Sequence, residues 1–167
     1  GILLGDYRFT KYKKTKKKKT DYKGLKSIQM AAHTSVKQIR KGARNGQFFA
    51  AAACKARDMA NEPGNGWTSK EFADYAKSLS KKYGFKCTCL EKKDLEKLGM
   101  GGILGVNQGS AIPPRMVILE YNLSPKNDTL LLVGKGITFD TGGISLKPPA
   151  GMEEMKYDMC GGAAVLS

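Results

Sequence analysis

Four ionisable residues fall within one glycine-rich stretch late in the sequence: Lys135, Asp140, Lys147 and Asp158. The stretch follows an apolar run at residues 129–133, and open α/β sheets bind their ligands at the ends of such buried strands. Two carboxylates beside a flexible loop favour a site for hard divalent cations. A lysine close to a metal can have a lowered pKa, and its neutral amine can then ligate the ion. The pattern therefore predicts a metal site.

Other interpretations of these residues stay open. Asp140 also suits an ordinary turn, and Asp158 suits the N-cap of a helix expected to follow it. The run Gly134-Lys135-Gly136 resembles a loose phosphate-binding loop, but the spacings of the P-loop and of the dinucleotide-binding motif are absent from this region. From residue chemistry alone, metal binding is one hypothesis among these.

The elements that must position these residues alternate between helices and strands. Residues 35–60 form an Ala-rich helical pattern, with one face available for burial by Phe48, Phe49, Ala52, Ala53, Ala56 and Met59. Thr68 followed by Glu71 predicts a capping box at the start of a helix, and Gly84 predicts its end. Further predictions are a helix end within 1–12, short strands at 25–30, 85–90, 116–121 and 129–133, a short helix at 92–97 and a turn region at 99–109.

This alternation indicates an α/β fold, in which a mostly parallel or mixed sheet is flanked by helices in a partial three-layer domain. We expect residues 1–34 to be the tail of an N-terminal domain with a basic loop. Residues 35–60 would be a linker helix, and residues 61–167 the first, incomplete part of a catalytic domain.

The net charge of +14 is concentrated at one end of the chain. Residues 1–60 hold 16 Lys and Arg against three acids, whereas residues 61–167 hold 13 against 12. The lysine run at residues 13–19 could attract a phosphate backbone, although a solvated loop is the commoner role of such a run. Nucleic-acid binding through this run is therefore kept as an alternative function.

The cysteines and apolar runs limit the class of protein. Cys54, Cys87, Cys89 and Cys160 do not form a disulfide framework, and His33 alone cannot complete a zinc site with them. Reduced thiols are typical of a cytoplasmic protein, and the apolar runs are too short to cross a bilayer. We expect no membrane association.

The chemistry-bearing stretch also resembles the active-site region of M17 leucyl aminopeptidases. The resemblance is carried by residues 135–143 (KGITFDTGG), by Leu146-Lys147 and by residues 152–159 (MEEMKYDM). Supporting similarity lies in residues 56–65 (ARDMANEPGN), 99–102, 109–110 with 113–115, and 7–13. The resemblance thus covers essentially the whole chain, and family members often carry a basic loop at the position of the lysine run.

The resemblance implies a role for each matching residue. Lys135 is expected to ligate one of two metal ions through its amine, Asp140 to be shared between the ions, and Asp158 to bind the lysine-held ion. Lys147 is expected to be the catalytic lysine that contacts substrate and stabilises the oxyanion. Met155 is expected to line the pocket for the first side chain of the substrate, although core packing is the commoner role of such a methionine.

The resemblance further implies a metalloaminopeptidase that removes leucine-like N-terminal residues from peptides. Two divalent ions (Zn²⁺ or Mn²⁺, with Mg²⁺ as a third option), a bicarbonate ion, a homo-hexamer and a cytoplasmic location would accompany that activity. The family's second metal-binding motif is absent from these residues, so we expect this chain alone to be inactive. Cys160 stands where a small residue is usual.

Overall fold

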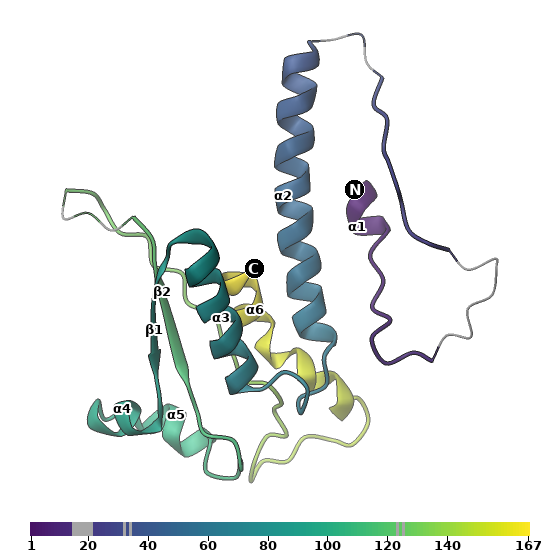
Figure 1. The fold of residues 1–167 in the computed structure, drawn as a ribbon. Helices are drawn as coiled ribbons and strands as arrows, with labels where there is room; N and C mark the ends of the chain where they lie inside the picture. Colours follow the sequence, from purple (N-terminus) through teal and green to yellow (C-terminus); the bar gives the residue numbers. More distant parts are fainter. Residues whose placement is uncertain (15–21, 32, 34, 123, 125) are drawn as a thin grey trace.

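The structure is a computed structural model that describes residues 1–14, 22–31, 33, 35–122, 124 and 126–167 (Figure 1). In chain order its elements are α1 (Ile2–Gly5), α2 (Val36–Asn61), α3 (Ser69–Tyr83), β1 (Lys86–Leu90), α4 (Lys92–Lys97), α5 (Gly101–Val106), β2 (Met116–Glu120), the 3₁₀ helix η1 (Met152–Met159) and α6 (Cys160–Leu166). Most of the lysine run, at residues 15–21, lies outside the described residues. Within the described part of the chain, no helix combines the length and apolar character that a membrane span requires.

The α/β class predicted from the sequence is confirmed, but the sheet differs from the expected parallel or mixed one. Strands β1 and β2 pair antiparallel, with Lys86 opposite Glu120 and Leu90 opposite Met116. Their connection forms α4 and α5 at one end of the sheet (Figure 1) and does not cross its face. A chain that turns back at the same end of a sheet must return antiparallel.

Three local predictions are wrong. Residues 129–133 form no strand, and Leu130 and Val133 are 84% and 83% exposed. A strand requires backbone partners, and no described strand pairs with this segment. Residues 25–30 are likewise extended and unpaired in the described sheet, while the expected turn region at 99–109 contains helix α5.

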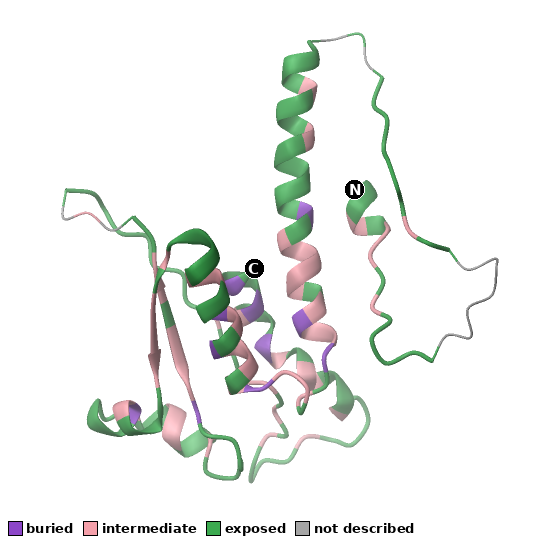
Figure 2. Ribbon diagram, in the orientation of Figure 1, coloured by how far each residue is buried: buried purple, intermediate pink, exposed green. Residues whose placement is uncertain are grey.

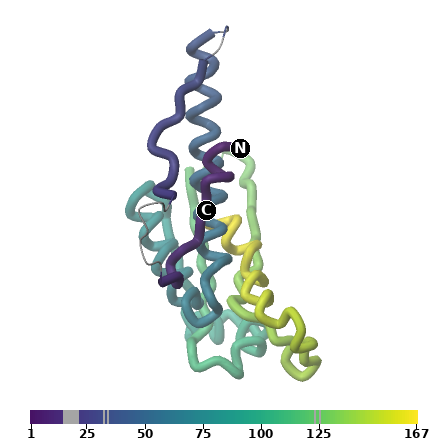
Figure 3. Tube along the Cα trace, turned by 90° about the vertical axis from the view of Figure 1, so that its right-hand side faces the viewer, coloured from purple at the N-terminus to yellow at the C-terminus, as the bar shows by residue number. Residues whose placement is uncertain are grey.

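Helix α2 is confirmed as one long helix, but only its C-terminal half is packed. Phe48 and Phe49, expected on the buried face, are 61% and 76% exposed, whereas Ala50 and Met59 are buried. The N-terminal half projects beyond the other described elements, while the C-terminal half lies beside α6 and η1 (Figures 1, 2 and 3). Apolar residues at helical spacing are buried only where another element packs against them. The described elements pack against the C-terminal half of α2 only.

The core lies where α2, α3, η1 and α6 meet. Met59 of α2, Met159 of η1 and Ala163 of α6 are each 1% exposed and form one buried cluster. Trp67 and Phe72 pack against this cluster with their rings edge to face, 5.6 Å apart between centroids. The cluster fixes η1 and the start of α6 against the end of α2.

A second constraint is a close approach of backbone to backbone. A Cβ atom on Gly134 would lie 2.3 Å from the carbonyl oxygen of Gly161, which no side chain could tolerate. The amide of Gly162 donates to the carbonyl oxygen of Lys135 at 2.7 Å. Residues 134–136 therefore pack directly against the first turn of α6.

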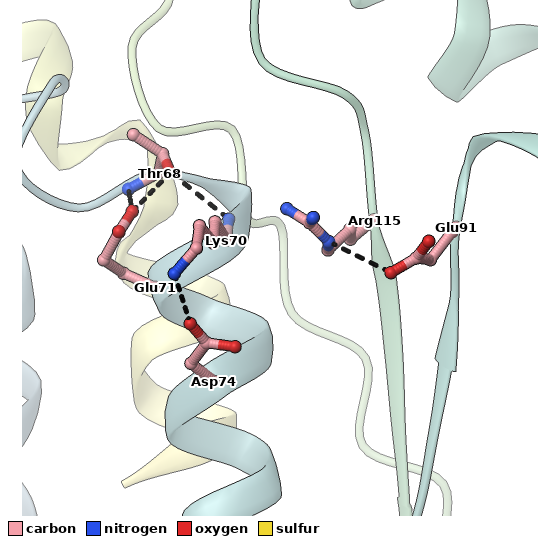
Figure 4. Close-up of polar contacts among 6 residues, drawn as sticks. All are labelled: Thr68, Lys70, Glu71, Asp74, Glu91 and Arg115. Carbon is pink, nitrogen blue, oxygen red and sulfur yellow. Dashed lines mark hydrogen bonds and ion pairs between the residues drawn. The ribbon is translucent and has the colours of Figure 1, made fainter.

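The predicted boundaries of α3 are confirmed (Figure 4). The Thr68 hydroxyl accepts a hydrogen bond from the amide of Lys70 at 3.2 Å. The Glu71 carboxylate accepts hydrogen bonds from the Thr68 amide at 2.9 Å and from the Thr68 hydroxyl. At the other end, Gly84 adopts φ +75°, a left-handed conformation that glycine tolerates best. Local sequence chemistry therefore determined where this helix begins and ends.

Adding one methyl group at Gly134 tests the close approach. We expect Gly134→Ala to lower the free energy of unfolding by about 1–3 kcal/mol or more, because the backbone of α6 must move aside. Gly136→Ala is the matched control: its Cβ would have no neighbour within 4 Å. Denaturant unfolding of the two variants measures the difference, and equal losses would contradict the close approach.

Removing the Thr68 side chain tests the cap at the start of α3. We expect Thr68→Ala to cost about 1 kcal/mol of stability, with Thr68→Ser, which keeps the hydroxyl, close to wild type. Hydrogen bonds from the Thr68 hydroxyl and then its amide lower the pKa of Glu71. A carboxylate with a lowered folded-state pKa stabilises the protein above its unfolded pKa of about 4.3 and loses that effect as the pH falls through the folded value.

The difference in stability between wild type and Thr68→Ala should therefore shrink on acidification. Unfolding measured near neutral pH and at about pH 3 checks this sign. A difference that grows in acid would mean that the Glu71 carboxylate does not contribute to the cap.

Candidate metal centre

The first pair of candidate residues joins Lys135 to Asp158. Lys135 belongs to the segment that packs against α6, and Asp158 lies in the last turn of η1, which leads into α6. Their Nζ and Oδ2 atoms lie 2.9 Å apart, with the Asp158 side chain 20% exposed. That oxygen is shielded from solvent, and the Lys135 ammonium is its ionic partner. A carboxylate oxygen in this state is available to a cation.

The second pair joins Asp140 to Lys147. Lys147 Nζ donates to Asp140 Oδ2 at 2.9 Å, and the amide of Gly142 donates to Asp140 Oδ1 at 2.8 Å. Gly142 has φ +90°, and the amide of Lys147 donates to the carbonyl of Thr141 at 2.9 Å, which closes the loop between them. Asp140 thus has the turn geometry considered in the sequence analysis as well as an ion-pair partner. The two roles coexist.

Met155 contacts the Lys147 ammonium of this second pair. Lys147 Nζ is 3.1 Å from the Met155 sulfur, and the Met155 side chain is partly exposed. A methionine packed purely in the core would be buried, as Met159 is. Met155 is therefore not a fully buried core residue, and its pocket-lining role stays a prediction.

The charges of the two pairs act on one another. The pKa of Lys135 is raised, first by its hydrogen bond to Asp158 and then by the charges of Asp158 and Asp140. The pKa of Asp140 is lowered, first by its hydrogen bond from Lys147, then by the Gly142 amide, with a smaller effect from Lys135. The fold thus joins the four predicted residues in two ion pairs, and the charges of Lys135 and Asp140 act on one another across them; we term these four residues the cluster.

The carboxylate partners of Lys135 hold its proton and raise its pKa. The sequence prediction of a lowered pKa concerned a lysine beside a bound metal ion, and it stays a prediction. Opposite charges favour the charged form of both partners. Lys135 can ligate an ion only after releasing this proton, so the ion must displace it from the ion pair.

The donor set fits part of a site for divalent ions. Two carboxylates and one amine match the oxygen and nitrogen ligands that Mn²⁺ and Zn²⁺ accept. Among the described residues, no group of three or more His, Cys, Asp or Glu side chains is clustered for metal binding. Two ions with six ligands each need more donors than this cluster offers. The cluster fits one part of a larger first shell.

One contact to the candidate loop was missed by the sequence analysis. Gly64 lies against Phe139, the neighbour of Asp140: a Cβ on Gly64 would be 2.9 Å from Phe139 Cβ and 3.3 Å from the Thr138 carbonyl oxygen. The sequence signal was a run of helix-breaking residues at 61–66, which marks a turn but does not show what the turn touches.

Comparison with known proteins shows the family to which this chain is similar. The model of the cytosol aminopeptidase family, catalytic domain, matches residues 54–167. A "Probable cytosol aminopeptidase" of Desulforapulum autotrophicum is 57% identical over 99% of this chain, which covers 32% of that protein. The one of Desulfotalea psychrophila is 54% identical over 99% of this chain, which covers 33% of it. The chain therefore spans about a third of the length of these relatives.

Solved structures show the same similarity. The bottromycin maturation enzyme BotP in complex with Mn aligns over 98% of this chain and 32% of its own, with a TM-score of 0.81 and 38% identity. A leucine aminopeptidase of Caenorhabditis elegans aligns over 70% of this chain and 24% of its own, with a TM-score of 0.66 and 32% identity. With a family model over more than half of its residues and these structural relatives, the chain belongs to the cytosol aminopeptidase family.

Proposed function

We propose that this chain supplies the first part of the two-metal centre of an aminopeptidase, which hydrolyses the N-terminal residue, with a leucine-like preference, from peptides. The observation that carries the proposal is the cluster of Lys135, Asp140, Lys147 and Asp158 in the segment matched by the family model. Family membership supports the aminopeptidase activity. The cluster supports the assignment of the metal site to these four residues.

Three of these residues would hold the ions. Lys135 and Asp158, already 2.9 Å apart, would bind one ion together, and Asp140 would be shared with the second. Divalent ions in such a site supply Lewis acidity and lower the pKa of bound water toward neutrality. BotP was solved in complex with Mn, which favours Mn²⁺ among the candidate ions. Zn²⁺ and Mg²⁺ remain within the proposal, as does a bicarbonate ion in the complete enzyme.

Lys147 would act on the substrate. Its ammonium is held at the cluster by Asp140 on one side and by the Met155 sulfur on the other, and its side chain is 34% exposed. A positive charge held in place beside the scissile carbonyl stabilises the oxyanion as it develops. Met155, in contact with the same ammonium, would line the pocket for the first side chain of the peptide.

The proposal extends to the complete protein. The remaining ligands would come from the part of the protein outside this chain, so the isolated chain would be inactive. A homo-hexameric assembly and a cytoplasmic location belong to the same proposal. The alternative of a non-catalytic, nucleic-acid-binding module is not favoured, because the family match is to a catalytic domain.

Loss of Lys147 tests its assigned role. We expect Lys147→Ala in the full-length protein to lower kcat about 100- to 1000-fold on a Leu-p-nitroanilide substrate, with a smaller change in KM, because the lost charge acts on the transition state. Lys126→Ala, at an exposed position, is the control and should keep wild-type kinetics. Undiminished kcat in Lys147→Ala would remove Lys147 from the mechanism.

Metal removal tests the ligand set. We expect chelation with EDTA to abolish hydrolysis and added Mn²⁺ to restore it, since the ions supply the nucleophile. Asp140→Asn and Asp158→Asn should require at least about tenfold more Mn²⁺ for half-maximal activity, because each amide is a weaker ligand than a carboxylate. The exposed Asp128→Asn is the matched control. Full activity in EDTA would exclude the metal-dependent mechanism.

A further inference from the structure

Glu62 is a buried carboxylate outside the candidate metal centre. It follows α2 directly and is 7% exposed. Lys11 Nζ donates to its Oε1 at 2.6 Å, and the Tyr12 hydroxyl donates to its Oε2 at 2.5 Å. A buried charge is tolerated when it is paired and hydrogen bonded, and both conditions hold here. Lys11, Tyr12 and Glu62, which we term the Glu62 network, join residues 50 or more positions apart.

Further polar contacts extend the network along α2. The Tyr7 hydroxyl donates to Asp58 Oδ1 at 2.9 Å, and Asn61 Nδ2 donates to the Tyr7 hydroxyl at 3.2 Å. Arg57 Nη1 donates to the carbonyl oxygen of Leu4 at 3.1 Å. The N-terminal segment is therefore held to the last turns of α2 and to Glu62 by several hydrogen bonds. Glu62 is the most buried of these polar groups.

The chain leaves Glu62 through a tight turn that closes back on the carboxylate. The amides of Gly66 and Trp67 both donate to the carbonyl oxygen of Pro63, at 2.7 and 3.1 Å. A Cβ on Gly66 would lie 3.0 Å from both Glu62 Oε2 and the Tyr12 hydroxyl. The turn is thus packed around the hydrogen-bonded carboxylate, and its shape depends on that carboxylate staying in place.

The same turn presents Gly64 to the candidate metal centre. A Cβ on Gly64 would approach Phe139 Cβ to 2.9 Å and the Thr138 carbonyl oxygen to 3.3 Å, so Gly64 lies directly against this segment. Phe139 immediately precedes Asp140, whose carboxylate takes part in the Asp140–Lys147 pair. One continuous path therefore leads from Lys11 and Tyr12 through Glu62 and Gly64 to the loop that carries Asp140.

We propose that Glu62 is a positioning residue that sets the place of Asp140 by fixing the Gly64 turn against Phe139. Glu62 touches neither substrate nor ion; it acts through backbone contact. The proposal rests on the proposed function, in which Asp140 is a metal ligand. Groups that orient metal ligands from outside the first shell commonly change metal affinity about 10- to 100-fold when they are removed.

The test replaces Glu62 in the full-length protein and follows the Asp140 loop directly. We expect Glu62→Ala to speed amide hydrogen exchange in a peptide covering residues 138–147 and to weaken Mn²⁺ binding about tenfold. Glu62→Gln, which still accepts a hydrogen bond from Tyr12, should show a smaller effect on both. Tyr12→Phe removes one donor and leaves the Lys11 pair intact, so it gives a folded variant should Glu62→Ala fail to fold.

The control is Asp74→Asn. Asp74 also pairs with a lysine, Lys70, at 2.7 Å, but on the exposed face of α3 and without a link to the Gly64 turn. We expect this variant to match wild type in exchange at 138–147 and in Mn²⁺ binding. The ratio of effects on kcat and KM in the Glu62 variants should follow that of Asp140→Asn, because both act on the same ligand.

The outcomes separate the two proposals. Wild-type protein that binds no Mn²⁺ would contradict the proposed function, yet the exchange measurement would still report whether Glu62 holds residues 138–147. Glu62 and Tyr12 variants with a lowered Tm but unchanged exchange at 138–147 would overturn the positioning role, because the Glu62 network would then only stabilise the fold.

Discussion

The close approach of residues 134–136 to the first turn of α6 is the constraint on which the candidate centre depends. The absence of a side chain at Gly134 and Gly161 lets the two backbones meet, and the hydrogen bond from the Gly162 amide to the Lys135 carbonyl fixes their register. Lys135 and Asp158 reach each other at 2.9 Å only because of this contact. Glycine at these positions therefore serves the site as much as the fold.

Hydrophobic packing and polar contacts both stabilise this arrangement, and each makes a different contribution. The buried cluster of Met59, Met159 and Ala163 ties η1 and α6 to α2, and is not directional. Hydrogen bonds fix the orientation of the packed segments. Examples are the two hydrogen bonds that Glu62 accepts and the backbone hydrogen bond from the Lys147 amide to the Thr141 carbonyl oxygen. The first kind of force brings the segments together, and the second aligns the side chains that do chemistry.

The charge pattern of the cluster suits an exchange of a proton for a metal ion. Each carboxylate lies beside an ammonium group, so the four charged groups balance one another. Under the proposed function, a divalent ion held by Lys135 and Asp158 would replace the lysine proton, so the local charge would rise by one unit rather than two. The raised pKa of Lys135, caused first by its hydrogen bond to Asp158, implies that metal binding should be weaker in acid.

The sequence by itself determined the features that depend on neighbouring residues. The α/β alternation and the limits of α3 set by Thr68 and Gly84 could be predicted, because capping and periodicity are local signals. The ligand roles of Lys135, Asp140 and Asp158 stay predictions. Tertiary structure alone decided the antiparallel pairing of β1 and β2, the exposure of Phe48 and the contact of Gly64 with Phe139. These depend on which distant segments are present to pair or pack, and a pattern in one segment does not specify its partner.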